Sequence, residues 1–132
     1  MKDWKVLLVD DEVEFVSTLE QRLRLRGIDV SSAYDGTQAL VKINESKPHL
    51  IVLDVKMPGI GGLELLKRIK KEEPEIRVII LTGHGEAECE IEGKKLGAYE
   101  CLSKPLAIDV LIAKMRKALE NPESNRTSGN AE

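Results

Sequence analysis

The sequence contains no long apolar run, and its longest uninterrupted apolar stretches are only a few residues. A helix that crosses a bilayer needs about 20 consecutive, mostly apolar residues. The opening residues, MKDWKVLLVDDE, also have too short an apolar stretch before their acidic residues to act as a secretory signal peptide. These absences predict a cytoplasmic protein that makes no contact with membranes.

An excess of basic residues is also absent. The chain has 20 lysines and arginines against 23 aspartates and glutamates, which gives a formal net charge of −3. Proteins that bind nucleic acids normally carry a basic excess, because they neutralise phosphates. We therefore expect no direct contact with nucleic acid.

Cysteine is scarce, with two residues in the whole chain. Cys89 and Cys101 lie too far apart in the sequence for a CxxC motif of the kind that binds metals or carries redox chemistry. They are able to form one disulfide, but disulfides are rare in cytosolic proteins. We expect two free thiols.

What the sequence does contain is enough for one ordinary domain. Its 132 residues suffice for one compact core and are too few for two. Hydrophobic residues make up 42% and charged residues 33%, a balance typical of globular proteins. The last stretch, NPESNRTSGNAE, has almost no apolar residues, as disordered segments do. We predict one domain over residues 1–120 and a disordered tail or linker remnant over residues 121–132.

Five short apolar runs alternate with five stretches of helical periodicity. In the helical stretches, apolar residues recur at spacings of three and four, as in Phe15, Leu19 and Leu23. Residues 86–97 show the weakest helical pattern, because Gly93 interrupts a thin apolar stripe. Strand alternating with helix favours an α/β fold with a parallel sheet. The five apolar runs are residues 5–9, 28–30, 50–53, 78–81 and 99–102.

The composition of these runs predicts the strand order. VLLV, LIVL and VIIL are apolar throughout, as strands buried on both faces must be. The runs in IDVSS and YECLS mix polar and apolar residues, which suits the edges of a sheet. Three central strands and two edges fit a doubly wound, flavodoxin-like (βα)5 fold with the sheet order 2-1-3-4-5.

Polar residues follow the runs at the predicted carboxyl ends. VLLV leads to Asp10 and Asp11, LIVL to Asp54, and VIIL to Thr82. The last run is followed by Lys104. Since parallel strands all end at the same edge of a sheet, where open α/β sheets bind their ligands, we expect these groups to share one pocket.

The expected pocket combines three carboxylates with one ammonium group. Closely packed carboxylates repel one another unless a proton or a cation relieves the repulsion. A small number of hard oxygen ligands suits Mg²⁺, and the charge of Lys104 suits an anion. The residues therefore predict a Mg²⁺-dependent phosphoryl-transfer site in which one carboxylate is the nucleophile.

Four motifs stand at the ends of these runs: VDDE at 9–12, LDVKMPG at 53–59, LTGHG at 81–85 and LSKPL at 102–106. In this order and spacing they resemble the signatures of receiver domains of bacterial two-component response regulators, the CheY-like family. The resemblance covers residues 4 to about 120. One motif alone is weak, and four in register are strong. The resemblance implies a signalling module rather than an enzyme.

The resemblance implies a role for each carboxylate. Asp54 would accept a phosphoryl group from a sensor histidine kinase or a phosphotransfer protein and become an acyl phosphate. Asp11 and Asp54 would bind Mg²⁺ directly, together with the backbone carbonyl of Lys56. Asp10 would act on the metal mainly through water.

The resemblance also implies roles for the residues after the last two strands. Thr82 would donate a hydrogen bond to a phosphoryl oxygen, and Lys104 would pair with the phosphate. A cis peptide bond is usual before the proline that stands here at position 105. The switch would be read by an output domain or protein that binds residues 86–120.

Each of these residues also has a simpler structural interpretation. Asp11 suits a helix N-cap, since Glu14 three residues later completes a pattern like a capping box. Asp54 alone suits a residue that opens a loop, and Lys104 alone suits a solvated surface lysine. The functional interpretation depends on the four motifs occurring together.

One position departs from the family pattern. Receivers often have Tyr or Phe three residues before the lysine, and this chain has Cys101 there. Tyr99 shares the face of Cys101 if the two-residue period of a strand holds. We therefore leave open whether Tyr99 replaces the usual switching ring.

Two other functions compete with the signalling module. One is a Mg²⁺-dependent phosphatase or phosphotransferase that works through an aspartyl phosphate. Such enzymes carry a second acid two residues after the nucleophile, where this chain has Lys56. The other is a receiver-like domain that binds a partner without being phosphorylated, and the intact motifs argue against it. No output domain is recognisable after residue 120, so the chain is either a stand-alone receiver or part of a longer regulator.

Overall fold

The computed structural model of the chain describes residues 3–55, 61–83 and 86–120, except for the side chains of residues 86–90. Strands and helices alternate through these ranges, as the periodicity predicts. The strands are β1 (Lys5–Val9), β2 (Asp29–Ala33), β3 (Leu50–Leu53), β4 (Arg77–Thr82) and β5 (Glu100–Ser103). The helices are α1 (Val13–Leu25), α2 (Gly36–Glu45), α3 (Gly62–Glu72), α4 (Glu86–Lys95) and α5 (Ile108–Glu120).

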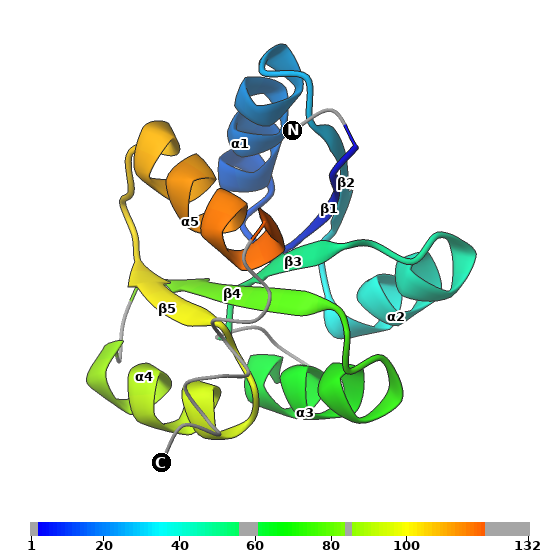
Figure 1. Cartoon of the computed structure of the whole chain (residues 1–132), viewed down its shortest axis with the longest axis vertical. Coiled ribbons are helices and arrows are strands. Elements are labelled where there is room, and N and C mark those ends of the chain that lie inside the picture. The colour runs from blue at the N-terminus through cyan, green and yellow to red at the C-terminus, as the bar shows by residue number, and fades with distance from the viewer. Residues whose placement is uncertain (1–2, 56–60, 84–85, 121–132) are drawn as a thin grey trace.

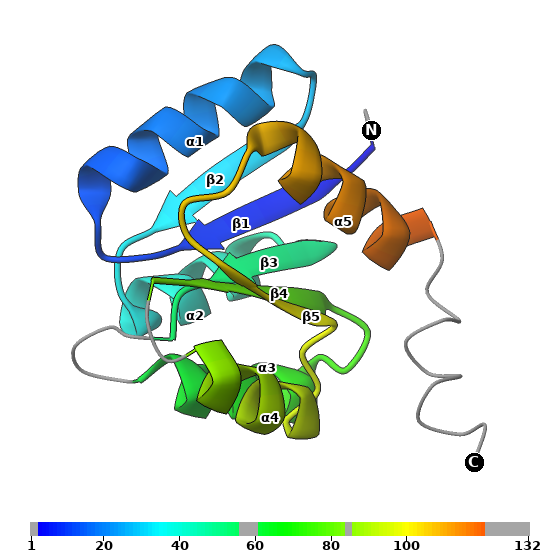
Figure 2. The same cartoon turned by 90° about the vertical axis from the view of Figure 1, so that its left-hand side faces the viewer.

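The five strands form one parallel sheet in the order β2-β1-β3-β4-β5, which confirms the predicted doubly wound fold. Figure 1 shows α1 and α5 on one face of the sheet and α2, α3 and α4 on the other. All strands point the same way, so their carboxyl ends lie along one edge, on the left of Figure 2. That edge is where the predicted site residues lie.

The sheet is buried on both faces because its central strands are apolar at successive positions. Leu7 belongs to the apolar layer beneath α2 and α3, and its neighbour Leu8 belongs to the layer beneath α1 and α5. The helices α1, α2, α3 and α5 each contribute an apolar stripe, such as Leu65 and Ile69 of α3 or Met115 of α5. Successive side chains of a strand point to opposite faces, which explains why these runs contain no polar residue.

Among the described helices, none is both long enough and apolar enough to cross a membrane.

The first helix starts later than the capping-box interpretation predicts. Its N-cap is Glu12, which makes no side-chain capping hydrogen bond, and the helix begins at Val13. The local hydrogen bond comes instead from the Glu12 backbone N–H to Asp10 Oδ1, 2.9 Å away. The interpretation of Asp11 as an N-cap is therefore wrong, because Asp11 still belongs to the turn that leaves β1.

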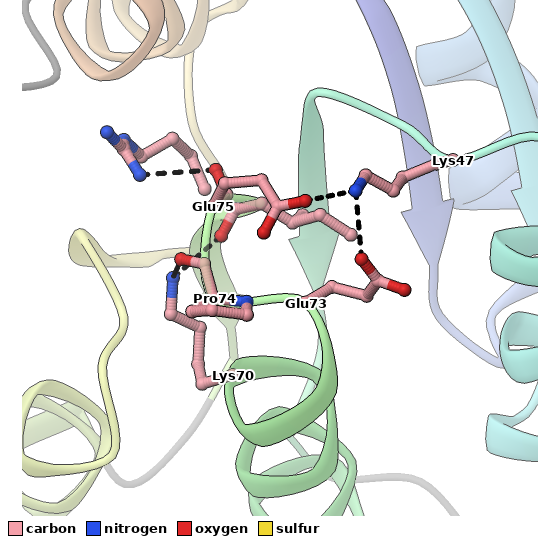
Figure 3. A network of polar contacts seen from close by, with 7 residues as sticks. Lys47, Lys70, Glu73, Pro74 and Glu75 are labelled. Carbon is pink, nitrogen blue, oxygen red and sulfur yellow. Dashed lines mark hydrogen bonds and ion pairs between the residues drawn. The ribbon is translucent and has the colours of Figure 1, made fainter.

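A polar network joins α3 to β4 at the opposite, amino-terminal edge of the sheet (Figure 3). The Lys70 ammonium donates hydrogen bonds to the carbonyls of Pro74 (2.8 Å) and Ile76 (2.7 Å). Lys47 forms ion pairs with Glu73, at 2.9 Å, and with Glu75. Burial of Lys70 lowers its pKa, whereas the hydrogen bond to Lys47 lowers the pKa of the exposed Glu75. These contacts hold the turn between α3 and β4 in place.

Gly62 ties the start of α3 to the backbone that carries Asp54. Its N–H donates a hydrogen bond to the carbonyl of Val55, 3.1 Å away. A Cβ atom at Gly62 would lie 2.2 Å from Val55 Cα and 2.5 Å from the Asp54 carbonyl oxygen. Both neighbours are backbone atoms, so the clash is relieved only if the chain around Asp54 moves.

We predict that Gly62→Ala lowers the free energy of unfolding by at least about 2 kcal/mol, as overpacking against rigid atoms does. Gly61→Ala is the matched control, because a Cβ there meets no atom within 4 Å. Gly61 is the N-cap of α3, where Ala is less favourable than Gly, so the effect of Gly61→Ala should be about 1 kcal/mol or less. Urea unfolding of the three proteins measures both values. An effect of Gly62→Ala as small as that of Gly61→Ala would contradict the close approach.

Candidate functional site

Backbone hydrogen bonds place the site residues directly after the strands. The N–H of Asp10 donates to the Ala33 carbonyl at 3.1 Å, and the N–H of Asp54 donates to the Val9 carbonyl at 2.9 Å. The N–H of Lys104 donates to the Thr82 carbonyl at 2.8 Å. Each bond extends a strand ladder by one residue, so the side chains that follow are held at the edge of a rigid sheet.

Three aspartates form a cluster at this edge. One carboxylate oxygen from each of Asp10, Asp11 and Asp54 lies within 4.8 Å of the others. Asp10 is 4% exposed and Asp54 is 5% exposed, whereas Asp11 faces solvent. Burying like charges this close is costly unless a cation compensates them. Carboxylate oxygens at one partly open edge are the donor set that suits Mg²⁺, which keeps several of its waters.

Lys104 supplies positive charge to the same cluster. Its ammonium nitrogen lies 2.8 Å from Asp10 Oδ2, 2.6 Å from Glu12 Oε1 and 3.7 Å from Asp54 Oδ2. Burial lowers the pKa of Lys104, but its hydrogen bonds to Asp10 and Glu12 outweigh that effect, so the pKa is raised above the ordinary 10.5. Lys104 therefore keeps its charge throughout the physiological pH range.

The side chain of Lys104 reaches over α1 as well as over the sheet. Its ammonium nitrogen lies 4.5 Å from the centre of the Phe15 ring, a cation–π distance. The peptide bond between Lys104 and Pro105 is cis, as the resemblance implies. The lysine, whose backbone directly follows β5, is thus in contact with residues that follow β1 and β3 and with Phe15 of α1.

Thr82 and Lys56 are the other residues that the sequence predicts for this site. Thr82 is fully buried at the end of β4, with its Cα paired to that of Ser103 in β5. The structure thus brings Asp10, Asp11, Asp54 and Lys104 together and places Thr82 at the same edge. Lys56, the predicted source of a metal-binding carbonyl, lies outside the described residues.

Two residues of this site were not predicted. Glu12 makes the shortest described contact of the Lys104 ammonium, and Phe15 carries the ring above which that ammonium lies. The sequence did hold a signal for both. Glu12 follows the two aspartates directly, and Phe15 stands three residues later, so one helical turn brings it back to the same side.

The residues of and next to β5 differ from expectation. Cys101 is buried and disulfide-bonded, and no cysteine is free in the part of the chain that the structure describes, so the prediction of two free thiols is wrong. The only other cysteine of the sequence is Cys89, whose side chain lies outside the described residues. Cys89 and Cys101 lie 12 positions apart in the sequence, and this separation alone does not say how close the two residues lie in the folded chain.

Tyr99 does not share the face of Cys101. It packs against the layer under α1 and α5, whereas Cys101 belongs to the layer on the side of α2 and α3. The two-residue period fails because Tyr99 precedes β5, which begins at Glu100. The prediction that Tyr99 and Cys101 share a face of the sheet is therefore wrong.

We predict that Mg²⁺ stabilises this protein by neutralising the aspartate cluster. At 100 times the dissociation constant, the gain in the free energy of unfolding is about 2.7 kcal/mol. Asp11→Asn should lose most of that gain, and without metal it should be at least as stable as the wild type because one repelling charge is gone. Asp29→Asn, an exposed aspartate of β2, is the control. Equal stabilisation of all three proteins by Mg²⁺ in urea unfolding would contradict the cluster as a metal site.

Comparison with known proteins agrees with this geometry. Residues 6–116 match the model of the response regulator receiver domain. The chain is 42% identical over 120 residues to a transcriptional regulatory protein CpxR homologue of Haemophilus influenzae, and 38% identical over 119 residues to sporulation initiation phosphotransferase F of Bacillus subtilis. It is similar to the crystal structure of the receiver domain of NtrX from Brucella abortus, with a TM-score of 0.83 and 37% identity, covering 88% of this chain and 98% of that one.

The lengths of these relatives differ. The match covers 91% of this chain but 52% of the CpxR homologue, and in another transcriptional regulatory protein the chain spans 25% of the length. The match with the sporulation phosphotransferase covers 90% of this chain and 96% of that protein. The region shared with this chain is therefore nearly the whole of one small relative and only one portion of the larger ones.

Proposed function

The chain belongs to the response regulator receiver domain family, a family of signalling domains, and we propose that Asp54 is the residue on which it accepts its phosphoryl group. The observation that carries this proposal is the position of Asp54: a carboxylate 5% exposed, at the end of a central strand, within 4.8 Å of two other aspartates and 3.7 Å from an ammonium group. Asp10 has the same burial and the same neighbours, but its two carboxylate oxygens accept hydrogen bonds from the Glu12 N–H and the Lys104 ammonium. The choice of Asp54 between the two also rests on its place in the LDVKMPG motif. The ammonium lies within reach of a group carried by Asp54.

The proposed step forms one bond and breaks one. A carboxylate oxygen of Asp54 attacks the phosphorus of a phosphohistidine on a sensor histidine kinase or a phosphotransfer protein. The P–N bond breaks, and its electron pair leaves with the imidazole, which takes up a proton from solvent. The product is an aspartyl acyl phosphate, whose phosphoryl oxygens lie close to the charge of Lys104.

The remaining residues of the site support that step. Asp11 and Asp54, with the carbonyl of Lys56, are the proposed direct ligands of Mg²⁺, and Asp10 is a proposed ligand through water. A bound Mg²⁺ would supply positive charge against the transferring phosphoryl group. Thr82, buried at the end of β4, is proposed to donate its hydroxyl hydrogen to a phosphoryl oxygen.

The proposed output is a change in partner binding. We assign it to residues 86–120, which include α4, β5 and α5, acting on an output domain or a separate protein. Relatives that are transcriptional regulatory proteins extend well beyond the region shared with this chain, which supports an output outside it. Their work on transcription also supports action in the cytoplasm. We propose no direct contact of this domain with nucleic acid.

An enzyme that turns over phosphorylated substrates is the less favoured alternative. A Mg²⁺-dependent phosphatase or phosphotransferase of the aspartyl-phosphate type has an acid two residues after its nucleophile, and this chain has Lys56 there. The described site also places its lysine among the carboxylates, which suits a held phosphoryl group. We propose a switch and not an enzyme.

We predict that Asp54→Asn abolishes phosphoryl incorporation from a small phosphodonor in the presence of Mg²⁺. The amide is not a nucleophile that forms an acyl phosphate, so the variant should show no mass gain when the wild type shows one phosphoryl group. Asp29→Asn, an exposed aspartate of β2, should behave as the wild type. Intact-protein mass spectrometry measures all three. An unchanged mass gain in Asp54→Asn would place the phosphoryl group elsewhere.

A further inference from the structure

We propose that Glu12 is a positioning residue that holds the Lys104 ammonium away from Asp54 until a phosphoryl group displaces it. This inference rests on the proposed function, since it concerns the phosphoryl group on Asp54. Glu12 would act on the reaction only through Lys104. Its carboxylate and the phosphoryl group would compete for the same cation.

The distances from the Lys104 ammonium nitrogen carry the proposal. Glu12 Oε1 is 2.6 Å away and Asp10 Oδ2 is 2.8 Å away, both at hydrogen-bond distance. Asp54 Oδ2 is 3.7 Å away, which is an ion pair without a direct hydrogen bond. The lysine is thus bound to the two acids that are not the proposed phosphoacceptor.

Asp10 and Glu12 hold the lysine as one unit. The Glu12 N–H donates to Asp10 Oδ1 at 2.9 Å, while Asp10 Oδ2 accepts from Lys104. Glu12 therefore fixes the orientation of the Asp10 carboxylate with its backbone and binds the lysine with its side chain. The Phe15 ring, whose centre lies 4.5 Å from the same ammonium nitrogen, adds a cation–π contact to the lysine.

The Glu12 side chain is able to release the lysine at small cost. It is 62% exposed, and as the N-cap of α1 it makes no capping hydrogen bond. Lys104 is its one side-chain partner among the described residues. When the lysine leaves, water is able to hydrate the Glu12 carboxylate in its place. The carboxylates of Asp10 and Asp54 are buried, so water does not replace the lysine there.

The consequence is a penalty on phosphorylation. To meet a phosphoryl oxygen on Asp54, Lys104 must give up its contact with Glu12. An ion pair with one exposed partner is worth up to about 1 kcal/mol, which corresponds to a factor of about five in an equilibrium. Removing the Glu12 carboxylate should therefore raise the affinity of the site for a phosphoryl group by about that factor.

The test compares Glu12→Gln with the wild type and with Glu14→Gln. Glu14 is an exposed acid in the same first turn and has no ion pair in the described part of the chain, so it controls for the loss of one negative charge. Two quantities are measured at saturating Mg²⁺: the rate of phosphoryl incorporation from acetyl phosphate and the affinity for beryllofluoride, an analogue of the phosphoryl group. We expect both to rise about fivefold in Glu12→Gln and to change less than twofold in Glu14→Gln.

The same substitutions in a Lys104→Met background separate positioning from a general charge effect. There the gain from Glu12→Gln in rate and in beryllofluoride affinity should vanish, because the cation for which the two groups compete is gone. A gain of the same size without Lys104, an equal gain in Glu14→Gln, or no gain at all would overturn the proposal. If the wild type takes up phosphoryl groups and Glu12→Gln shows no gain, the positioning role alone fails. If the wild type takes up none, the proposed function fails and this inference fails with it.

Discussion

One ammonium group among three carboxylates is the interaction on which this structure depends. Asp10 and Asp54 are buried at the edge of an apolar sheet, where an uncompensated charge is costly. Lys104 contacts both of them and Glu12, although it lies about 50 residues or more from each of the three in the sequence. The fold has to bring the end of β5 back to the ends of β1 and β3 to make these contacts.

The doubly wound topology makes that approach possible. Because β3 and β4 separate β1 from β5 in the sheet, Lys104 has to reach across the end of β4. Its backbone is anchored to the Thr82 carbonyl there, and its long side chain spans the remaining distance. The apolar layers on both faces keep the strands in register, so the edge is rigid while the groups on it remain polar. A compact charged site is thus a consequence of parallel strands that end together.

Much of this arrangement could be predicted from local sequence. The alternation of apolar runs with helical periodicity predicted all five strands and the sheet order, because burial on both faces leaves a composition that is easily recognised. Polar residues after the runs predicted that Asp10, Asp11, Asp54 and Lys104 would meet, because the carboxyl ends of parallel strands share an edge. These predictions depended on patterns of two to four residues.

The predictions that failed depended on distances or on the ends of elements. Counting cysteines does not say how near Cys101 lies to another thiol, so the free-thiol prediction was wrong. The face of Tyr99 was wrong because β5 begins one residue after it, and the N-cap moved from Asp11 to Glu12 for a similar reason. The choice of Glu12 as a partner of Lys104 follows from that shift, since an N-cap without a capping bond leaves its carboxylate available.

The most direct test of the central interaction is the coupling free energy between Lys104 and Asp10. Urea unfolding of the wild type, Lys104→Met, Asp10→Asn and the double variant forms a complete cycle. If the ammonium compensates the buried carboxylate, the double variant should lose less stability than the sum of the single variants, with a coupling of at least about 1 kcal/mol. Losses that simply add would contradict the account, because they would show that the Lys104 ammonium and the Asp10 carboxylate do not stabilise one another.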